Sequence, residues 1–120
     1  MMTINQRAID DVTILDIVGR ITVQEGAEKF RDAVRQLVRD GQVKLVINFR
    51  DATYIDSTAL GEIIRAYTSA TRKGGSLKLL KVTGSIHQLL MITRLLTVFD
   101  LFDEEAQAVK SFGVPRSSNP

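Results

Sequence analysis

Hydrophobic and polar residues alternate along the first part of the chain. Two alternating stretches, residues 4–9 and 12–18, are separated by Asp10-Asp11. Alternation with a period of two is typical of strands with one buried face, and a short polar break between two such stretches favours a tight turn. The pattern therefore predicts a hairpin of two short strands, the second ending at Gly19-Arg20.

The pattern then changes to a helix followed by a buried strand. Thr22, with Glu25 three residues later, has the spacing of a capping box, which predicts a helix that starts near Val23. Apolar residues at helical spacing continue the helix until Gly41 ends it. The run VKLVINF, residues 43–49, is almost continuously apolar, which is typical of a strand covered on both faces.

The second half of the chain repeats this alternation. Residues 50–55 are expected to lead away from the strand, and a second helix is expected from Ser57 or Thr58 to Gly74-Gly75. The remaining expected elements are strands at residues 77–82 and 98–102, a helix opened by a capping box at Ser85 and Gln88, and a last helix capped by Asp103.

The order of these elements, β-β-α-β-α-β-α-β-α, determines the expected fold class. Strands that alternate with helices indicate right-handed crossovers in a largely parallel sheet, and the opening hairpin adds an antiparallel edge. We expect an α/β fold with a mixed, largely parallel sheet of about five strands packed with about four helices. Residues 1–112 are expected to form a single domain, and residues 113–120 a flexible C-terminal tail.

Composition narrows the classes of function. The chain has 120 residues, of which 44% are hydrophobic and 25% charged, as in an ordinary globular domain. The absence of cysteine excludes disulfides, thiolate metal sites and a cysteine nucleophile. The net charge of +2 gives no reason to expect direct nucleic-acid binding. No apolar run approaches the roughly 18 residues that span a membrane, and MMTINQRAIDD lacks the apolar core of a secretory signal, so we expect a cytoplasmic protein without membrane insertion.

The segment YIDSTALGEIIRAY contains the candidate functional site. Asp56, Ser57 and Thr58 lie between an apolar strand and an amphipathic helix, where α/β proteins tend to place their sites. The free backbone N–H groups and the dipole at a helix start tolerate a phosphorylated serine. The alternative is that one of the three residues only caps the helix. Leu60 and Gly61, three residues after Ser57 and Thr58, do not complete a capping box.

The chain resembles the STAS domain family, which is named after sulfate transporters and anti-sigma factor antagonists. The stretch ATYIDSTALGEIIRAYTSATRKGGSLKLL resembles the strand, D-S-[S/A/T]-G-L-G turn, helix and glycine stop of that family. ILDIVGRITVQEGAEKF and TVFDLFDEEAQAV resemble its second strand with the first helix and its closing segment, so the resemblance covers residues 4–112. Ala59 stands where glycine is most usual, and its methyl group is expected to affect slightly how a partner approaches.

The resemblance implies a phosphorylation switch. It implies that Ser57, with Thr58 as the reserve site, is phosphorylated by an anti-sigma factor with serine kinase activity, and that a PP2C-type phosphatase removes the phosphate. The unmodified protein would bind the anti-sigma factor and so release a sigma factor for transcription. The implied partner-binding residues are Arg20, Ile21, Thr22, Asp56, Ser57, Thr58, Ala59, Leu60 and Gly61.

Two other classes of function compete with this switch. Family members also serve as STAS subunits of lipid or ABC transport complexes or of stress-sensing scaffolds. An enzyme with Ser57 as nucleophile needs a nearby base, and the chain has only His87 and no G-x-S-x-G elbow. We therefore expect no catalytic residues, metal or cofactor, and the sequence leaves homodimer formation open. The basic residues Arg65, Arg72, Lys73, Lys78 and Lys81 are interpreted as a solvated face, or else as a patch for an acidic partner.

Overall fold

The computed structural model describes residues 2–113, which form the predicted series of five strands and four helices. The element order β-β-α-β-α-β-α-β-α confirms the prediction. The elements are β1 (Thr3–Ile9), β2 (Val12–Ile21), α1 (Ala27–Arg39), β3 (Lys44–Ile55), α2 (Ser57–Arg72), β4 (Ser76–Leu80), α3 (Gly84–Ile92), β5 (Asp100–Phe102) and α4 (Glu105–Phe112).

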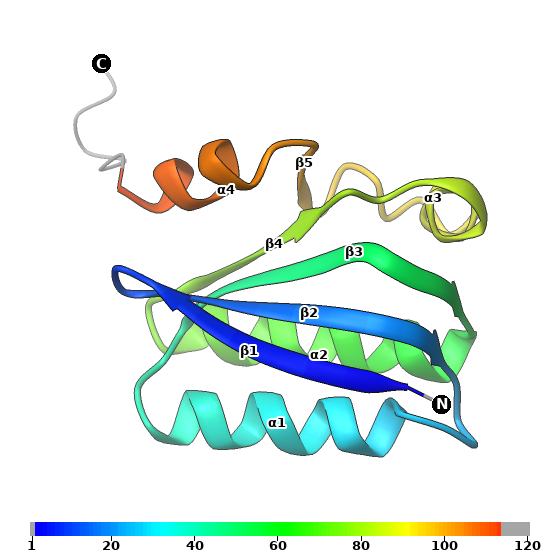
Figure 1. Cartoon of the computed structure of the whole chain (residues 1–120), viewed down its shortest axis with the longest axis horizontal. Coiled ribbons are helices and arrows are strands. Elements are labelled where there is room, and N and C mark those ends of the chain that lie inside the picture. The colour runs from blue at the N-terminus through cyan, green and yellow to red at the C-terminus, as the bar shows by residue number, and fades with distance from the viewer. Residues whose placement is uncertain (1, 114–120) are drawn as a thin grey trace.

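The strands form one mixed sheet in the order β1-β2-β3-β4-β5. β1 pairs with β2 in antiparallel fashion, and all other neighbours are parallel, which confirms the predicted α/β class. Helices α1 and α2 lie side by side against one face of the sheet, and α4 lies on the opposite side (Figure 1). Each parallel connection passes through a helix, as βαβ units require.

Successive residues of β3 supply cores on both sides of the sheet. Leu45, Ile47 and Phe49 are buried in the main cluster, which includes the apolar faces of α1 and α2. Val46, between them, belongs to a smaller cluster with Ala108 of α4. Because side chains of a strand point to opposite faces in turn, the continuous apolar run in the sequence corresponds to a strand covered on both sides.

Both β2 and β3 extend beyond their predicted ends. Gly19-Arg20 does not end β2, which continues to Ile21, and residues 50–55 stay in β3. The two strands pair along this extension, with register irregularities near Gly19, until Ile21 lies opposite Ile55. The extension occurs because each strand supplies hydrogen-bond partners for the other. The last two predicted strands are shorter in the structure: β4 covers Ser76–Leu80, and β5 covers only Asp100–Phe102.

The predicted start of α1 near Val23 is wrong. Thr22 Oγ1 does accept a hydrogen bond from Glu25 N (3.1 Å), but this bond closes a turn. Gly26 follows with a φ of 91°, in the left-handed region, and the helix begins only at Ala27. The left-handed glycine interrupts the helical path, so the capping-box sequence forms a separate turn here.

Two more predicted caps are wrong. At α3, Thr83 occupies the N-cap without a side-chain hydrogen bond, and Ser85 already lies inside the helix. At α4, the N-cap is Glu104, and the backbone oxygen of Asp103 accepts a hydrogen bond from Lys81 Nζ (2.8 Å). Short polar residues near a helix start do not reveal which of them has the N-cap conformation.

Gly74 and Gly75 end α2 for two different physical reasons. Gly74 has a φ of 85°, which side chains rarely adopt. Gly75 lies so close to Val43, the residue before β3, that a Cβ atom would approach Val43 O to 2.0 Å. The pair therefore stops the helix and lets the chain turn tightly back into the sheet.

The prediction that Lys78 belongs to a solvated basic face is wrong. It is buried under α4, with Nζ 3.2 Å from Asp100 Oδ2 and 4.9 Å from the ring centre of Phe112. The predicted flexible tail, residues 113–120, lies outside the described residues except for Gly113.

None of the described helices is long and apolar enough to cross a membrane.

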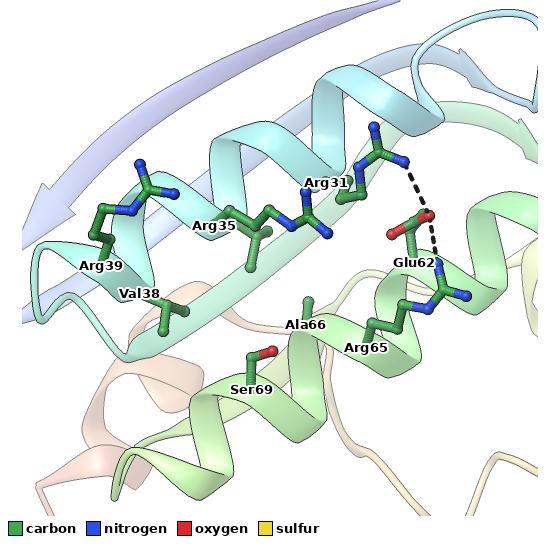
Figure 2. A pocket seen from close by; sticks show the side chains of 9 residues that line it. Arg31, Arg35, Val38, Arg39, Glu62, Arg65, Ala66 and Ser69 are labelled. Atoms are coloured by element: carbon green, nitrogen blue, oxygen red, sulfur yellow. Dashed lines mark hydrogen bonds and ion pairs between the residues drawn. The ribbon is translucent and has the colours of Figure 1, made fainter.

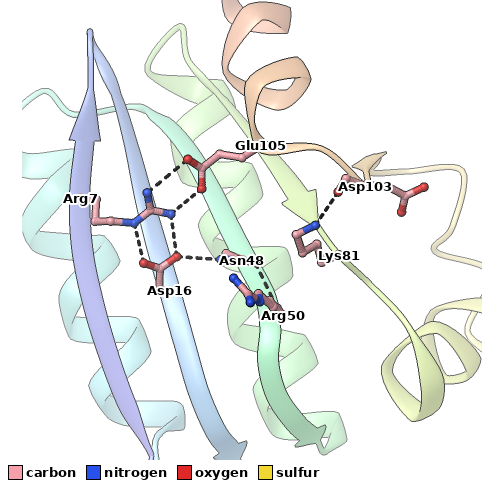
Figure 3. Close-up of polar contacts among 7 residues, drawn as sticks. All are labelled: Arg7, Asp16, Asn48, Arg50, Lys81, Asp103 and Glu105. Carbon is pink, nitrogen blue, oxygen red and sulfur yellow. Dashed lines mark hydrogen bonds and ion pairs between the residues drawn. The ribbon is translucent and has the colours of Figure 1, made fainter.

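A polar network joins three strands to the last helix. Arg7 of β1 donates to Asp16 of β2 (Nε to Oδ2, 2.6 Å) and to Glu105 of α4 (Nη1 to Oε2, 3.2 Å), and Asn48 of β3 also donates to Asp16 (2.8 Å), as Figure 3 shows. Burial raises the pKa of Asp16, but hydrogen bonds from Arg7 and Asn48 outweigh it, so the pKa lies below its usual 3.8. The hydrogen bond from Arg7 likewise lowers the pKa of Glu105 below 4.5.

We expect Arg7→Met to lower the free energy of unfolding by about 1 kcal/mol at neutral pH, because the network is partly solvent-exposed. Both carboxyl groups have lower pKa values in the folded chain than in the unfolded chain. Their contribution is thus present above about pH 5 and is lost as the pH falls through the folded values. Urea unfolding from about pH 7 to about pH 3 should show the difference from wild type shrinking with acidification. The control is Arg72→Met, an exposed residue without an ion pair in the described part, and a pH-independent difference would contradict the prediction.

Candidate functional site

The candidate site lies where β2 and β3 end side by side. Because these strands are parallel and paired up to Ile21 and Ile55, the loop after β2 lies against the start of α2. Asp56 N donates a hydrogen bond to Ile21 O (3.2 Å), which joins the two strand ends. The structure thereby brings together the two segments that the sequence predicted for partner binding, residues 20–22 and 56–61.

Asp56 is the N-cap of α2, and its side chain holds two segments at once. Oδ1 accepts a hydrogen bond from Ala59 N (2.8 Å), and Oδ2 accepts one from Val23 N (2.8 Å). Burial raises the pKa of Asp56, but backbone donors at Ala59, Val23 and Thr58 lower it more, so the pKa lies below 3.8. The carboxylate is therefore ionised at neutral pH, and each of its oxygens accepts a backbone hydrogen bond.

Ser57 and Thr58 occupy the first two positions of α2 and are exposed. Neither hydroxyl has a hydrogen-bond partner among residues 2–113. Asp56 performs the capping, which settles which of the three polar residues is the cap. The hydroxyls of Ser57 and Thr58 thus lie free at a helix start, where unpaired N–H groups and the dipole favour negative charge.

Three of the predicted partner-binding residues have buried side chains. Ile21, Ala59 and Leu60 are 1%, 1% and 5% exposed and belong to the main core. The methyl group of Ala59 therefore points into the core, away from any approaching partner, which differs from the expectation that it affects partner approach. Gly61 is half-buried, and a Cβ atom there would meet nothing within 4 Å.

Sequence reasoning missed two apolar residues beside the site. Val23 is 65% exposed and Tyr54 is 40% exposed, and the guanidinium carbon of Arg20 lies 5.0 Å from the centre of the Tyr54 ring. The signal for Tyr54 was its place next to Ile55 in the strand, since neighbouring residues point to opposite faces. We define the Ser57 surface as the accessible residues around the site, namely Arg20, Val23, Tyr54, Ser57, Thr58 and Gly61.

The site is chemically simple. No group of three or more His, Asp or Glu side chains that could hold a metal ion occurs among the described residues. His87 is exposed on α3, and within the described residues no hydrogen bond joins it to the hydroxyl of Ser57 or Thr58. The arrangement offers two accessible hydroxyl groups, an ionised carboxylate and an aromatic ring, which suit recognition and modification.

Replacing Asp56 should separate its two contacts. Asp56→Ala removes both acceptors and should lower the free energy of unfolding by about 1–2 kcal/mol. Asp56→Asn keeps one side-chain oxygen, which can still cap Ala59 N, but it loses the second acceptor for Val23 N. Amide hydrogen exchange should therefore accelerate at both Ala59 and Val23 in Asp56→Ala, but chiefly at Val23 in Asp56→Asn. Equal protection of Val23 in all three proteins would contradict the role assigned to Asp56 Oδ2.

Two curated relatives are similar in sequence to more than half of the chain. The anti-sigma-B factor antagonist of Bacillus subtilis (strain 168) is 32% identical over 87 residues, which cover 72% of this chain and 78% of that protein. The anti-sigma F factor antagonist of Paenibacillus polymyxa is 27% identical over 70 residues, 58% of this chain. The match spans only 60% of the length of that second relative.

Solved structures share the fold at low sequence identity. An anti-sigma factor antagonist from Mycobacterium paratuberculosis has a TM-score of 0.85 at 18% identity, over 95% of this chain and 96% of that one. The phosphorylated form of SpoIIAA, a Bacillus cell fate determinant, has a TM-score of 0.73 at 13% identity, over 92% and 98% of the two chains. The model of the STAS domain family matches residues 3–108. The chain therefore belongs to the STAS domain family.

Proposed function

We propose that this protein is a cytoplasmic anti-sigma factor antagonist that is switched at Ser57. In its unmodified form it binds an anti-sigma factor through the Ser57 surface, and so releases a sigma factor for transcription. The anti-sigma factor is a serine kinase that phosphorylates Ser57 and thereby ends the contact. A PP2C-type phosphatase restores the binding form. The protein itself acts by binding and performs no catalysis.

One observation supports this proposal more than any other. The hydroxyl of Ser57 is exposed at the start of α2 and has no hydrogen-bond partner within residues 2–113, and the carboxylate next to it already caps the helix. A kinase can therefore reach the hydroxyl without breaking a hydrogen bond of the fold. The phosphate would then lie at the positive end of the helix dipole, so the helix can carry it without unfolding.

The charge of the phosphate explains the release of a partner. Phosphorylation adds about −1.5 to −2 charge at neutral pH, directly beside the ionised Asp56. Within a contact surface that includes apolar Val23 and Tyr54, this charge would have to lose its water and would lack a partner. A penalty of about 3 kcal/mol weakens binding by roughly 10²-fold. The names of the two curated relatives, both antagonists of anti-sigma factors, agree with this partner class.

Phosphate mapping tests the switch directly. The unmodified chain, purified from native cells, is used to recover its anti-sigma factor, and the recovered kinase is then incubated with ATP and each variant. We expect mass spectrometry to place phosphate on Ser57 in the wild type and in Thr58→Ala, and to find none in Ser57→Ala. Ser57→Asp should bind the anti-sigma factor at least about tenfold more weakly than Ser57→Ala.

The two alanine variants are matched, because both remove an exposed hydroxyl from the first turn of α2, and neither hydroxyl has a partner in the described part of the chain. Continued phosphorylation of Ser57→Ala together with its loss in Thr58→Ala would move the switch to Thr58. Recovery of a membrane transport complex or a scaffold, and of no anti-sigma factor, would replace the proposal by the transport or stress-sensing alternative.

Gly61 offers a separate test of where the partner binds. Since a Cβ atom at Gly61 meets nothing within 4 Å, Gly61→Ala should fold normally. Its free energy of unfolding should rise by about 0.5–1 kcal/mol, because alanine favours a helix interior more than glycine does. The added methyl group projects from the Ser57 surface, so affinity for the anti-sigma factor should fall, as titration calorimetry can measure. A variant that is more stable and binds equally well would exclude Gly61 from the contact surface.

A further inference from the structure

A second site is formed by a cleft between α1 and α2, away from the Ser57 surface. The cleft has a volume of about 360 Å³, which is within the usual range for small-molecule sites. Figure 2 shows side chains from both helices directed toward it. The residues that line it are Arg31, Val34, Arg35, Val38, Arg39, Glu62, Arg65, Ala66 and Ser69.

The floor of the cleft is apolar and small. Val34 and Ala66 are each 4% exposed, and Val38 packs against the same core. The short side chains of Ala66 and Ser69 on α2 leave room between the helices. An apolar body of a few carbon atoms can therefore bury its surface there, with a gain of roughly 25 cal/mol for each Å² removed from water.

The α1 wall of the cleft carries three arginines, two of which have no ion pair in the described chain. Arg31, Arg35 and Arg39 follow one another at intervals of four residues, so they lie on one face of α1. Arg31 lies near three carboxylates, the closest at 3.7 Å, whereas Arg35 and Arg39 have no ion pair or hydrogen bond within residues 2–113. Like charges at this spacing weaken a helix slightly, so helix stability does not account for them.

The opposite wall contains a buried carboxylate with an unmet hydrogen bond. Glu62 of α2 is 6% exposed, and its Oε2 lies 3.1 Å from Arg65 Nη1 and 3.9 Å from Arg31 Nη1. Its other oxygen, Oε1, is buried without a partner in the described chain. Buried carboxylate oxygens normally accept a hydrogen bond, so this atom lacks a donor that a ligand could supply.

We propose that this cleft binds a small organic anion that has an apolar body and a hydroxyl group. The carboxylate or phosphate of the ligand lies against the guanidinium groups of Arg35 and Arg39, which are suited to both. The apolar body covers Val34 and Ala66, and the hydroxyl donates to Glu62 Oε1. Arg31 and Arg65 neutralise Glu62, so its charge does not repel the anion. This inference is independent of the proposed function at the Ser57 surface.

The test uses NMR titration of the full chain with hexyl phosphate, inorganic phosphate and hexanol. We expect saturable amide shifts in α1 and α2 with hexyl phosphate, and binding about tenfold tighter than with either fragment, because head and body bind together. The same ester with a terminal hydroxyl should bind more tightly still. Shifts scattered over the surface, or no saturable shifts, would overturn the site. Equal binding of the two esters would overturn the role of Glu62 Oε1.

Matched variants separate this site from general attraction to a basic protein. The double variant Arg35→Gln/Arg39→Gln should weaken hexyl phosphate binding about tenfold. The control, Arg72→Gln/Lys73→Gln, removes the same charge at the end of α2, outside the cleft, and should leave binding nearly unchanged. All four residues are exposed, so both variants should keep the wild-type unfolding midpoint. Equal weakening in both would indicate nonspecific attraction. Ser57→Ala should bind the probe like the wild type, whatever its effect on the anti-sigma factor.

Discussion

The parallel pairing of β2 with β3 is the constraint on which the candidate site depends. The two strands stay paired until Ile21 lies opposite Ile55, well beyond the part of the sheet that β4 and β5 cover. Parallel strands end at the same edge, so the loop after β2 meets the first turn of α2. Without the last residues of this pairing, Asp56 could not bond both Ile21 O and Val23 N, and the two segments would lie apart.

Within this arrangement, the three neighbouring polar residues have different physical tasks. Asp56 uses both carboxylate oxygens to hold backbone N–H groups, and it is therefore part of the fold. Because Asp56 provides the cap, the hydroxyls of Ser57 and Thr58 in the first helical turn have no hydrogen-bond partner within residues 2–113. A serine that itself capped the helix would have to give up a hydrogen bond when modified. In the proposed switch, this separation of capping from modification would let a phosphate be added and removed at Ser57 without a cost in fold stability.

The sequence predicted the order of the elements well, because the change from a period of two to a helical period depends only on which faces are buried. The ends of the elements depend on features that no local pattern contains. The Thr22–Glu25 pair has capping-box spacing, but the left-handed conformation at Gly26 decides that it closes a turn. Residues 50–55, which mix polar and apolar side chains, were predicted to lead out of the strand because the pairing partner of that segment lies far away in sequence. The place of the site between a strand and a helix was visible in the sequence, and the family resemblance implied Ser57 as the modified residue, whereas the exposure of Tyr54 required the structure.

Helix α2 combines three demands that together explain its sequence. Its first turn presents Ser57 beside the end of β3, while Leu60 and Ile63 on its inner face fill the main core. Its remaining side faces α1, and there the helix carries small Ala66 and the buried Glu62. Core packing alone would favour an apolar residue at Glu62, since a buried ion pair gives little net stability. Arg65 of the same helix and Arg31 of α1 make that glutamate tolerable, whereas Arg35 and Arg39 of α1 have no ion pair within residues 2–113. These charges around the cleft add little to the stability of the fold, so a bound anionic ligand explains them most simply. The residues that carry them lie on two helices far apart in sequence, so no local pattern reveals the site.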